Sequence, residues 1–424
     1  MQTVRIPDDL ARTLVSAHAY ATDEIYETYR WLRANNPLGI AEVEGFDPFW
    51  VATKHADILE ISRNNARFPS AVRATTLTSK AGDARARAIT GTPHLVRSIV
   101  QMDEPDHMKY RLLIQSWLAP ANVRKREEEV RALARDAVAQ FEATAGKCDF
   151  VKDVALHYPL RVVMNILGVP PEDLPRMLRL TQELFGASDP DTERFKEAMT
   201  AEQFSTLLIA VVQDFSEYFE KLSADRRARP RDDLATVLAN AEIDGQPLPP
   251  LERTSYFTVI STAGHDTTSS STAGAMWALA TQPGLFARVK ADPTLIPALI
   301  EESIRWTTPV KTFMRSAAED TELRGRQLRS NDWIMLCYAS GNRDEEIFDA
   351  PDRFNIDRTP NRQLAFGNGA HVCIGQHLAR MEMRILFEEL LPRLKSVSLD
   401  GEPRMSESFF VNGLKSLPIR FELA

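Results

Sequence analysis

A cysteine in a glycine-rich loop is the side chain of this sequence best placed to do chemistry. Cys373 stands in the run Phe-Gly-Asn-Gly-Ala-His-Val-Cys-Ile-Gly (366–375), and the apolar residues that follow it recur at helical spacing. Unpaired backbone N–H groups and the positive dipole end at the start of a helix stabilise a thiolate. The arrangement favours a charged sulfur ligand over an inert core cysteine.

Other uses of the same loop fit its spacing less well. A dinucleotide loop needs a third glycine where Val372 stands, and covalent heme attachment needs Cys-x-x-Cys-His, which the sequence lacks here. A zinc site formed by His371, Cys373 and His377 stays open, although the paired cysteines typical of structural zinc are missing. A purely structural cysteine is the remaining alternative.

An acid–alcohol pair lies in the middle of a long helical segment. Asp266 and Thr267 follow Ala-Gly-His (263–265) within residues 250–281, for which the composition predicts one helix about 45 Å long at 1.5 Å per residue. Ser or Thr fills every position from 267 to 272, and such hydroxyls compete for backbone carbonyls. This weak point indicates either a functional position, where an acid and a hydroxyl relay protons, or close packing against a neighbouring helix.

Two charged pairs recur at helical spacing elsewhere. His107 and Arg111 are four residues apart, so they share one helix face and together suit a carboxylate. Glu302 and Arg305 are three residues apart and can form an ion pair. Either pair taken alone is equally typical of a solvated helix surface.

The elements that must position these residues are mainly helices. Helical composition recurs over residues 122–143, 199–223, 250–281, 294–306 and 376–393. Strands are predicted at 40–44, 49–52, 333–338 and within 409–421, with hairpin turns at Asn412-Gly413 and Asp244-Gly245. Residues 68–104 and 186–194 lack a clear period, which is typical of functional lids or tolerated surface loops. No linker divides the chain, so one mainly α domain over residues 1–424 is expected.

The composition narrows the class of protein. The 424 residues carry 51 Lys and Arg against 59 Asp and Glu, and this net charge of −8 argues against nucleic acid and against an anionic membrane surface. No segment approaches the roughly 20 apolar residues of a membrane span, and no signal peptide is recognisable. Three cysteines do not make a disulfide framework, and Cys148 and Cys337 are interpreted as structural. A cytoplasmic protein without a membrane anchor is expected.

Residues 366–375 resemble the cysteine-ligand loop of the cytochrome P-450 superfamily, Phe-Gly-x-Gly-x-(His/Arg)-x-Cys-x-Gly, and match every fixed position. The resemblance covers nearly the whole chain, because four further patterns occur in the family order, and their wording is most similar to the soluble α-terpineol-hydroxylase branch. It implies a large helical domain with small β-sheets and a long central oxygen-binding helix. It also implies a non-covalent heme b whose axial thiolate is Cys373, a ligand that favours O–O cleavage.

The resemblance also assigns roles to the other motifs. Proton delivery falls to Asp266 and Thr267, and Ala263 and Gly264 leave room for the heme beside them. The remaining heme-binding positions, which include cations for the propionates, are His107, Arg111, Arg315, Phe366, Gly367, His371 and Gly375.

A structural network on the cysteine side is the next implication of the resemblance. It would join Glu302 to Arg305, and Arg353 would complete it. Lys311 departs from the apolar expectation for the strand that precedes Arg315, and its direction stays undecided between the heme pocket and a polar partner outside that pocket.

The implied enzyme is a heme-thiolate monooxygenase acting on a small hydrophobic substrate, a monoterpenoid or an alkyl-aromatic compound. Expected pocket residues are Met102, Leu184, Phe185, Ile260, Ala263, Val310, Phe313, Phe410 and Val411. The sequence holds no flavin or nicotinamide domain, so electrons must come from outside the chain. The resemblance to soluble bacterial members implies a 2Fe-2S ferredoxin with its reductase as their source, and a monomeric enzyme is expected. Its docking face would surround Cys373 and include Lys109, Arg362, Arg380 and Arg384.

Two other functions remain as alternatives. A peroxide-driven heme-thiolate oxidase is disfavoured because its relatives typically replace the acid–alcohol pair, which is intact here. A non-catalytic heme sensor or carrier has no need of that relay.

Overall fold

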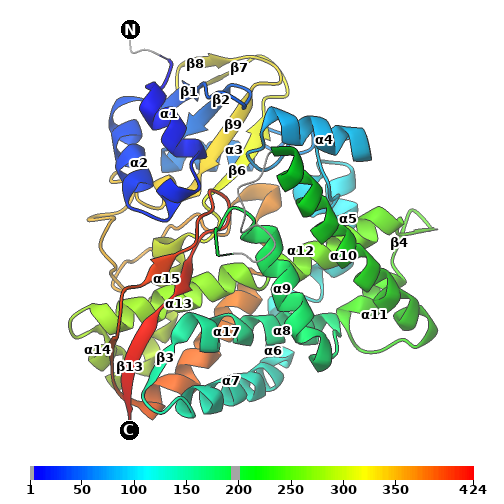
Figure 1. The fold of residues 1–424 in the computed structure, drawn as a ribbon. Coiled ribbons are helices and arrows are strands. Elements are labelled where there is room, and N and C mark those ends of the chain that lie inside the picture. Colours follow the sequence, from blue (N-terminus) through cyan, green and yellow to red (C-terminus); the bar gives the residue numbers. More distant parts are fainter. Residues whose placement is uncertain (1–3, 192–200) are drawn as a thin grey trace.

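A body of helices with a four-stranded sheet at one end and smaller sheets elsewhere makes up the computed structural model, which describes residues 4–191 and 201–424 (Figure 1). The helices are α1 (Asp8–Val15), α2 (Glu24–Asn35), α3 (His55–Arg63), α4 (Lys80–Thr90), α5 (Asp106–Gln115), α6 (Pro120–Lys125), α7 (Glu127–Glu142), α8 (His157–Leu167), α9 (Leu174–Phe185), α10 (Ala201–Ala228), α11 (Leu234–Ala239), α12 (Pro250–Ala263), α13 (Asp266–Thr281), α14 (Leu285–Ala291), α15 (Ile296–Thr307), α16 (Tyr338–Gly341) and α17 (Gln376–Leu390). The expectation of a mainly α fold is confirmed.

The four-stranded sheet lies in the order β1-β2-β9-β6. Its strands are β1 (Leu38–Ala41), β2 (Phe49–Ala52), β6 (Thr312–Ser316) and β9 (Trp333–Cys337), of which β2 and β9 run parallel and the other pairs antiparallel. A second sheet, in the order β10-β13-β3, joins β10 (Leu394–Leu399), β13 (Pro418–Leu423) and β3 (Lys147–Asp149). Two-stranded pairs are β4 (Glu242–Ile243) with β5 (Gln246–Pro247), β7 (Thr321–Leu323) with β8 (Arg326–Leu328), and β11 (Arg404–Met405) with β12 (Leu414–Ser416).

The single helix expected over residues 250–281 is wrong, because Gly264 and His265 separate α12 from α13. Thr267 Oγ1 donates to the Ala263 carbonyl at 2.7 Å, so a side-chain hydroxyl binds backbone at the break. A Cβ on Gly264 would stand 2.8 Å from Val163 Cγ2, so only glycine lets α8 approach this point so closely. The hydroxyl run therefore marks a real discontinuity in the helix.

Of the two predicted hairpin turns, one is present. Asp244 and Gly245 join β4 to β5 with φ values of 51° and 75°, the left-handed conformations that a two-residue turn of this kind needs. The hairpin predicted at Asn412-Gly413 is wrong, because this dipeptide does not directly join two paired strands. The strand after it, β12, pairs with β11, and β13 pairs with β10 and β3. Gly413 serves close packing instead, because a Cβ there would lie 2.2 Å from Ser270 Oγ on α13.

Two segments predicted to be irregular have different outcomes. Residues 68–104 contain α4 and a short 3-10 turn at Ile99–Gln101, so the absence of a helical period there was misleading. Of residues 186–194, positions 192–194 lie outside the described residues.

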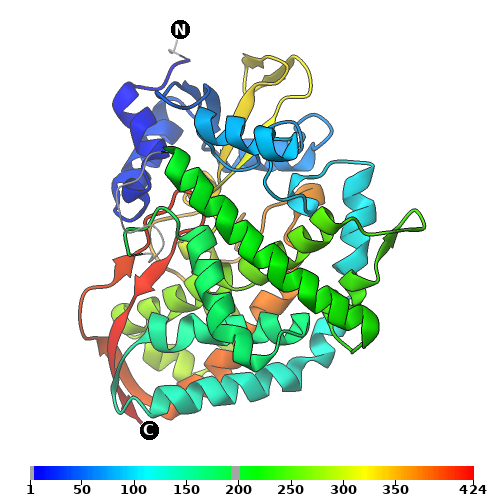
Figure 2. The same ribbon diagram turned by 45° about the vertical axis from the view of Figure 1, so that its right-hand side comes forward.

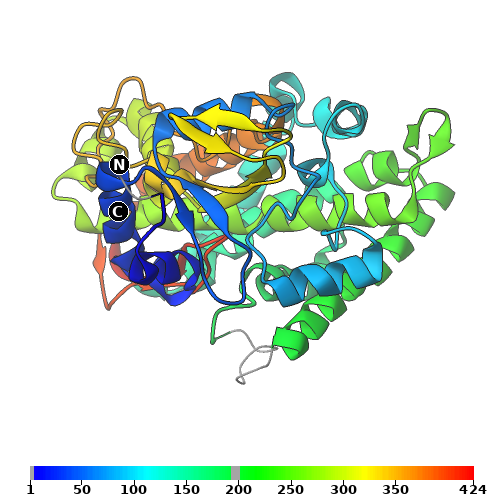
Figure 3. The same ribbon diagram turned by 90° about the horizontal axis from the view of Figure 1, so that it is seen from above.

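Helices α8, α12, α13 and α17 bury the largest apolar core, to which Phe257, Met276 and Leu386 contribute. The long helix α10 lies across α9 and α12 on one face of this body (Figure 2). Viewed from above, α4 lies beside α10 (Figure 3). Helix α13 packs against α15, and α15 packs against α17, so the predicted relay helix and the helix that follows Cys373 are held by a common neighbour.

Candidate functional site

One cavity brings together most of the residues that the sequence marked for chemistry. It lies between the cysteine loop, the break that separates α12 from α13, α5 and the start of β6. Its lining includes His107, Arg111, Ala263, Thr267, Val310, Phe313, Arg315, Phe366, Gly367, His371 and Cys373. Motifs more than 250 residues apart in the sequence therefore line the same cavity.

The loop presents Cys373 to this cavity directly before α17. The Cys373 N–H donates to the Phe366 carbonyl at 2.8 Å, which folds the loop back on itself. Gly367 and Gly369 have φ values of 68° and 70°, and a Cβ on Gly369 would lie 2.0 Å from the Ser62 carbonyl oxygen. Gly375 directly precedes the first turn of α17. The glycines therefore serve the turn and the close approach that the sequence suggested.

The surroundings of the Cys373 thiol act on it in two directions. Cys373 is exposed at the cavity wall, and desolvation of the thiol by the protein atoms around it raises its pKa. The N–H groups of Gly375 and Gln376 and the guanidinium groups of Arg111 and Arg380 lower it. N–H groups that favour the thiolate are the hydrogen-bond donors expected around a sulfur ligand of iron.

Four potential cations line the cavity beside the cysteine loop, with few anions to balance them: His107, Arg111, Arg315 and His371. Neither ring nitrogen of the buried His107 has a hydrogen-bond partner, and Nδ1 lies 3.6 Å from Glu104. Buried Arg315 donates from Nη1 to the Met314 carbonyl at 2.8 Å. His371 packs against His107 with ring centroids 4.4 Å apart.

Electrostatics give this cluster a preference for anions. Burial, together with Arg315, His107 and Arg111, lowers the pKa of His371 to about 2. Among the described residues, no carboxylate lies within 4.0 Å of the guanidinium groups of Arg111 or Arg315. A group carrying two carboxylates would supply the missing partners, so the residues present fit the propionates of a heme.

The acid and the alcohol of the predicted relay face two different cavities. Thr267 lines the cavity with Cys373, as do Thr268 and Ser271. Asp266 lines a neighbouring cavity of about 950 Å³, where its Oδ2 lies 3.5 Å from His265 Nδ1 and has no hydrogen-bond partner. The pair therefore bridges α13 from one cavity to the other.

The predicted structural network is present, but its third guanidinium differs from the prediction. Glu302 and Arg305 are both fully buried and are joined by bonds of 2.8 and 2.7 Å. Arg358 Nε donates to Glu302 at 3.0 Å, whereas Arg353 takes part through its carbonyl, which accepts from Arg305 at 3.1 Å. The third guanidinium is therefore that of Arg358 and not that of Arg353, and bonds to the Asp349 and Ala350 carbonyls hold Arg358 beside the acid.

The predicted pocket residues divide into three groups. Val310 and Phe313 lie on the cavity wall with Cys373, and Phe410 contacts Phe313 with ring centroids 5.3 Å apart. Phe185 and Val411 line the neighbouring cavity that Asp266 reaches. Met102 is buried in the apolar core, Leu184 and Ile260 are partly buried against it, and none of the three lines either cavity within the described chain, so their place in the pocket stays a prediction.

Sequence reasoning also missed wall residues. These are chiefly Ile99, Val100, Val259, Pro309 and Ala365. Ile99 and Val100 fall in the segment without a period, where an apolar pair inside a polar stretch was the only available signal.

The zinc alternative finds no support in the described part of the chain, where no three His, Cys, Asp or Glu side chains are placed to hold a metal ion. His377 lines a shallow surface cavity with Arg124, Arg380 and Arg384 instead of joining Cys373. Within the same residues, no helix combines the length and apolar character needed to cross a bilayer.

Three features together define a heme-thiolate protein. They are a thiol presented by a glycine loop, a cluster of cations that suits propionates, and an interrupted helix that lines the same cavity. The family model for cytochrome P450 matches residues 69–423, and the chain belongs to the cytochrome P450 family. These proteins carry heme b with a cysteine thiolate as axial ligand, and the chain is a P450 monooxygenase by family.

Several known proteins are similar to the chain over nearly its full length. Cytochrome P450-terp of a Pseudomonas species is 47% identical over 99% of both chains, and linalool 8-monooxygenase of Pseudomonas putida is 32% identical over 94% of this chain and 96% of its own. The crystal structure of CYP108D1 from Novosphingobium aromaticivorans superposes with a TM-score of 0.91, 44% identity and full coverage of both chains. The structure of a Mycobacterium marinum P450, CYP268A2, in complex with pseudoionone superposes with a TM-score of 0.88 and 31% identity, covering 98% of this chain and 99% of its own.

Proposed function

We propose that this P450 hydroxylates a small hydrophobic substrate, a monoterpenoid or an alkyl-aromatic compound, with O2 and two electrons from a 2Fe-2S ferredoxin. In balance, R–H, O2, two electrons and two protons give R–OH and water. The observation that carries the proposal is the single cavity in which Cys373 and Thr267 face the apolar side chains of Val310 and Phe313. The names of two relatives, cytochrome P450-terp and linalool 8-monooxygenase, support this substrate class.

When bound, the heme supplies the activation of oxygen. Cys373 would be the ligand of the heme iron. The hydrogen-bond donors around the Cys373 sulfur would limit electron donation by the thiolate. His107, Arg111, Arg315 and His371 would hold its propionates. Orientation of the substrate falls to the apolar wall on the Thr267 side.

Proton supply is the role proposed for Asp266 and Thr267. The side chain of Asp266 is 14% exposed and reaches the neighbouring cavity, from which we propose that it is reprotonated. Thr267 holds a hydroxyl in the substrate cavity, with its proton now donated to the Ala263 carbonyl. A proton taken up by the acid on one side of α13 can thus reach the hydroxyl on the other.

Electrons are proposed to enter at the face beside α17. Two of the expected docking cations are already engaged, since Arg380 pairs with Glu301, and Arg384 pairs with Glu127 and Glu388. Lys109 pairs with Asp244. A ferredoxin carboxylate would therefore compete with these internal partners, so docking through this face is expected to be weak and salt-sensitive.

A spectral titration followed by turnover tests the proposal. Terpineol, linalool and p-cymene are added to the heme-loaded enzyme, and the low- to high-spin shift reports entry into the cavity. Turnover is then measured with a ferredoxin, its reductase and NADH. Hydroxylated product in proportion to NADH supports the proposal, whereas product formed only with added peroxide points to the oxidase. A spin shift without product under either condition points to the sensor or carrier.

A further inference from the structure

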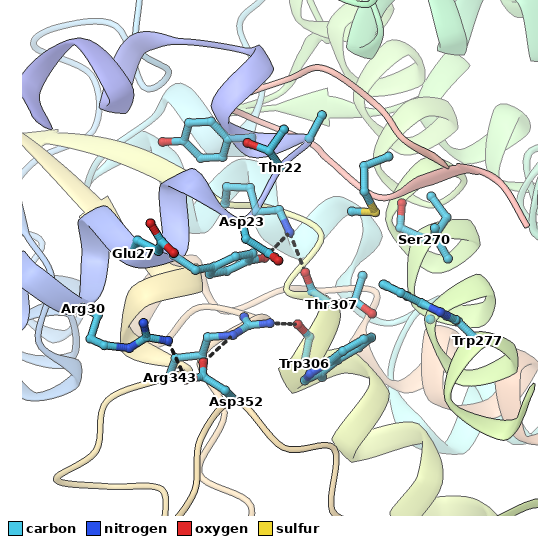
Figure 4. Close-up of a pocket in the computed structure, with 17 residues that line it drawn as sticks. Thr22, Asp23, Glu27, Arg30, Ser270, Trp277, Trp306, Thr307, Arg343 and Asp352 are labelled. Carbon is cyan, nitrogen blue, oxygen red and sulfur yellow. Dashed lines mark hydrogen bonds and ion pairs between the residues drawn. The ribbon is translucent and has the colours of Figure 1, made fainter. Parts of the chain in front are cut away.

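A pocket of about 460 Å³, here called the Lys311 pocket, lies beside α2 and shares no lining residue with the cavity that holds Cys373 (Figure 4). Its walls come from α2, α13, α15 and the segment before β6. A volume of this size is within the range of small-molecule sites, about 300–1,000 Å³. Its deep end is charged and its sides are aromatic.

Lys311 supplies the first charge at the deep end. Its side chain is turned away from the heme cavity and is 1% exposed. Its Nζ donates to the Thr307 carbonyl at 2.6 Å and to the Tyr26 hydroxyl at 3.5 Å. No carboxylate lies within 4.0 Å of it among the residues that the structure describes. A buried ammonium with only neutral partners is costly, and an anion would relieve that cost.

Arg343 supplies the second charge. It is 7% exposed, its guanidinium carbon lies 4.0 Å above the Tyr26 ring, and Nη2 donates to the Trp306 carbonyl at 3.1 Å. Its Nε lies 3.4 Å from Asp352, which also pairs with Arg30 at 2.9 Å. Nη1 is buried and has no hydrogen-bond partner. One donor of a buried cation is therefore left for a ligand.

Aromatic side chains form the wall beside these cations. The rings of Trp277 and Trp306 are 5.0 Å apart and tilted by 58°. Gly274 allows α15 to approach α13 here, because a Cβ at that position would lie 2.2 Å from Thr307 Oγ1. That buried hydroxyl has no hydrogen-bond partner either. The pocket thus offers a flat apolar contact next to donors in need of an acceptor.

We propose that the Lys311 pocket binds a small aromatic or cyclic monocarboxylate. Its carboxylate would sit between the Lys311 ammonium and the free Nη1 of Arg343, and its ring would lie against Trp277 and Trp306. The acids of the pocket, Asp23, Glu27 and Asp352, lie toward its rim, where all three are exposed. They disfavour a second negative charge on the ligand, which selects for a monoanion. This inference does not rest on the substrate proposed for the heme cavity.

Calorimetric titration of the heme-loaded enzyme tests the site. The probes are 2-naphthoate and its neutral isostere 2-naphthamide, and the Soret band is recorded to detect entry into the heme cavity. We expect naphthoate to bind without a Soret change and naphthamide to bind at least about tenfold more weakly, as the loss of a charged hydrogen bond implies. Lys311→Met should weaken naphthoate to a similar extent. Lys395→Met, which removes an exposed lysine elsewhere, should leave binding unchanged.

A second variant keeps the test decisive should Lys311→Met fail to fold. Thr22 lies exposed at the pocket edge, so Thr22→Trp narrows the entrance and leaves both cations in place. We expect it to weaken naphthoate binding while heme content and circular dichroism stay as in the wild type. The proposal is overturned by absent naphthoate binding in the wild type, by equal affinity for the amide, or by wild-type affinity in Thr22→Trp.

Discussion

Replacing Glu302 with Gln is expected to destabilise this enzyme far more than the same replacement at its neighbour Glu301. Glu302 is fully buried and accepts from Arg305 at 2.8 and 2.7 Å and from Arg358 at 3.0 Å. Gln keeps the size of the side chain, but it removes the charge and turns one acceptor into a donor that faces other donors. Two nearly inaccessible guanidinium groups then lose their counter-charge.

The structure gives the magnitude of this difference. Removing one partner of a buried ion pair costs about 3–5 kcal/mol. Glu301 pairs with Arg380 at a site where the two side chains are 29% and 32% exposed, and such a pair contributes about 0–1 kcal/mol. With an m-value of about 3 kcal/mol per molar urea, the Glu302→Gln midpoint should fall by about 1 M or more, and the Glu301→Gln midpoint by about 0.3 M or less.

Urea titration of the heme-loaded variants, followed by far-ultraviolet circular dichroism and by the Soret band, measures these midpoints. Midpoints are compared directly, because a large cofactor-bound chain does not guarantee two-state unfolding. Arg358→Met should lose stability in the same direction, while Arg353→Met should lose little, because only the Arg353 carbonyl joins the network. Equal midpoints for Glu302→Gln and Glu301→Gln would show that the buried network at Glu302 contributes no more than an exposed ion pair.

Three other predictions concern the cavity and the cysteines. Thr267→Ala should divert electrons into peroxide, because the cavity loses its relay hydroxyl; Thr267→Ser should restore coupling, and an unchanged ratio of product to NADH in the alanine variant would sink the assignment. Cys373→Ala should abolish the thiolate-type spectrum of the reduced carbon monoxide complex, whereas Cys148→Ala should keep that spectrum. If the spectrum survived in Cys373→Ala, Cys373 would not be the ligand. Burial raises the pKa of Cys148 to about 12, so iodoacetamide should label it slowly at pH 8 and about tenfold faster for each pH unit up to that pKa; a pH-independent rate would contradict the raised pKa.

Local signals in the sequence predicted several elements well. The spacing after Gly375 places the start of α17 correctly, and apolar runs mark β2 and β9. Asp244-Gly245 succeeds as a turn because both residues tolerate positive φ and the turn joins adjacent strands. Asn412-Gly413 fails because its glycine is needed for contact with Ser270, a residue more than 140 positions away.

The break between α12 and α13 could be suspected from the hydroxyl run but not located from it. Its position depends on how closely α8 approaches Gly264 and on which carbonyl the Thr267 hydroxyl reaches. The approach of α8 to Gly264 is a consequence of packing between segments about 100 residues apart. Helical propensity carries no information about such contacts.

The chemistry of this protein could be predicted from its residues alone: a cysteine ligand at position 373, cations for a dicarboxylate group and an acid beside an alcohol. The direction in which each side chain points is set by the tertiary structure. It placed Asp266 and Thr267 in different cavities, brought Arg358 to Glu302, and turned Lys311 away from the heme. Adjacent helical residues differ by about 100° in direction, so motif order fixes which groups are available, and only packing fixes what each one faces.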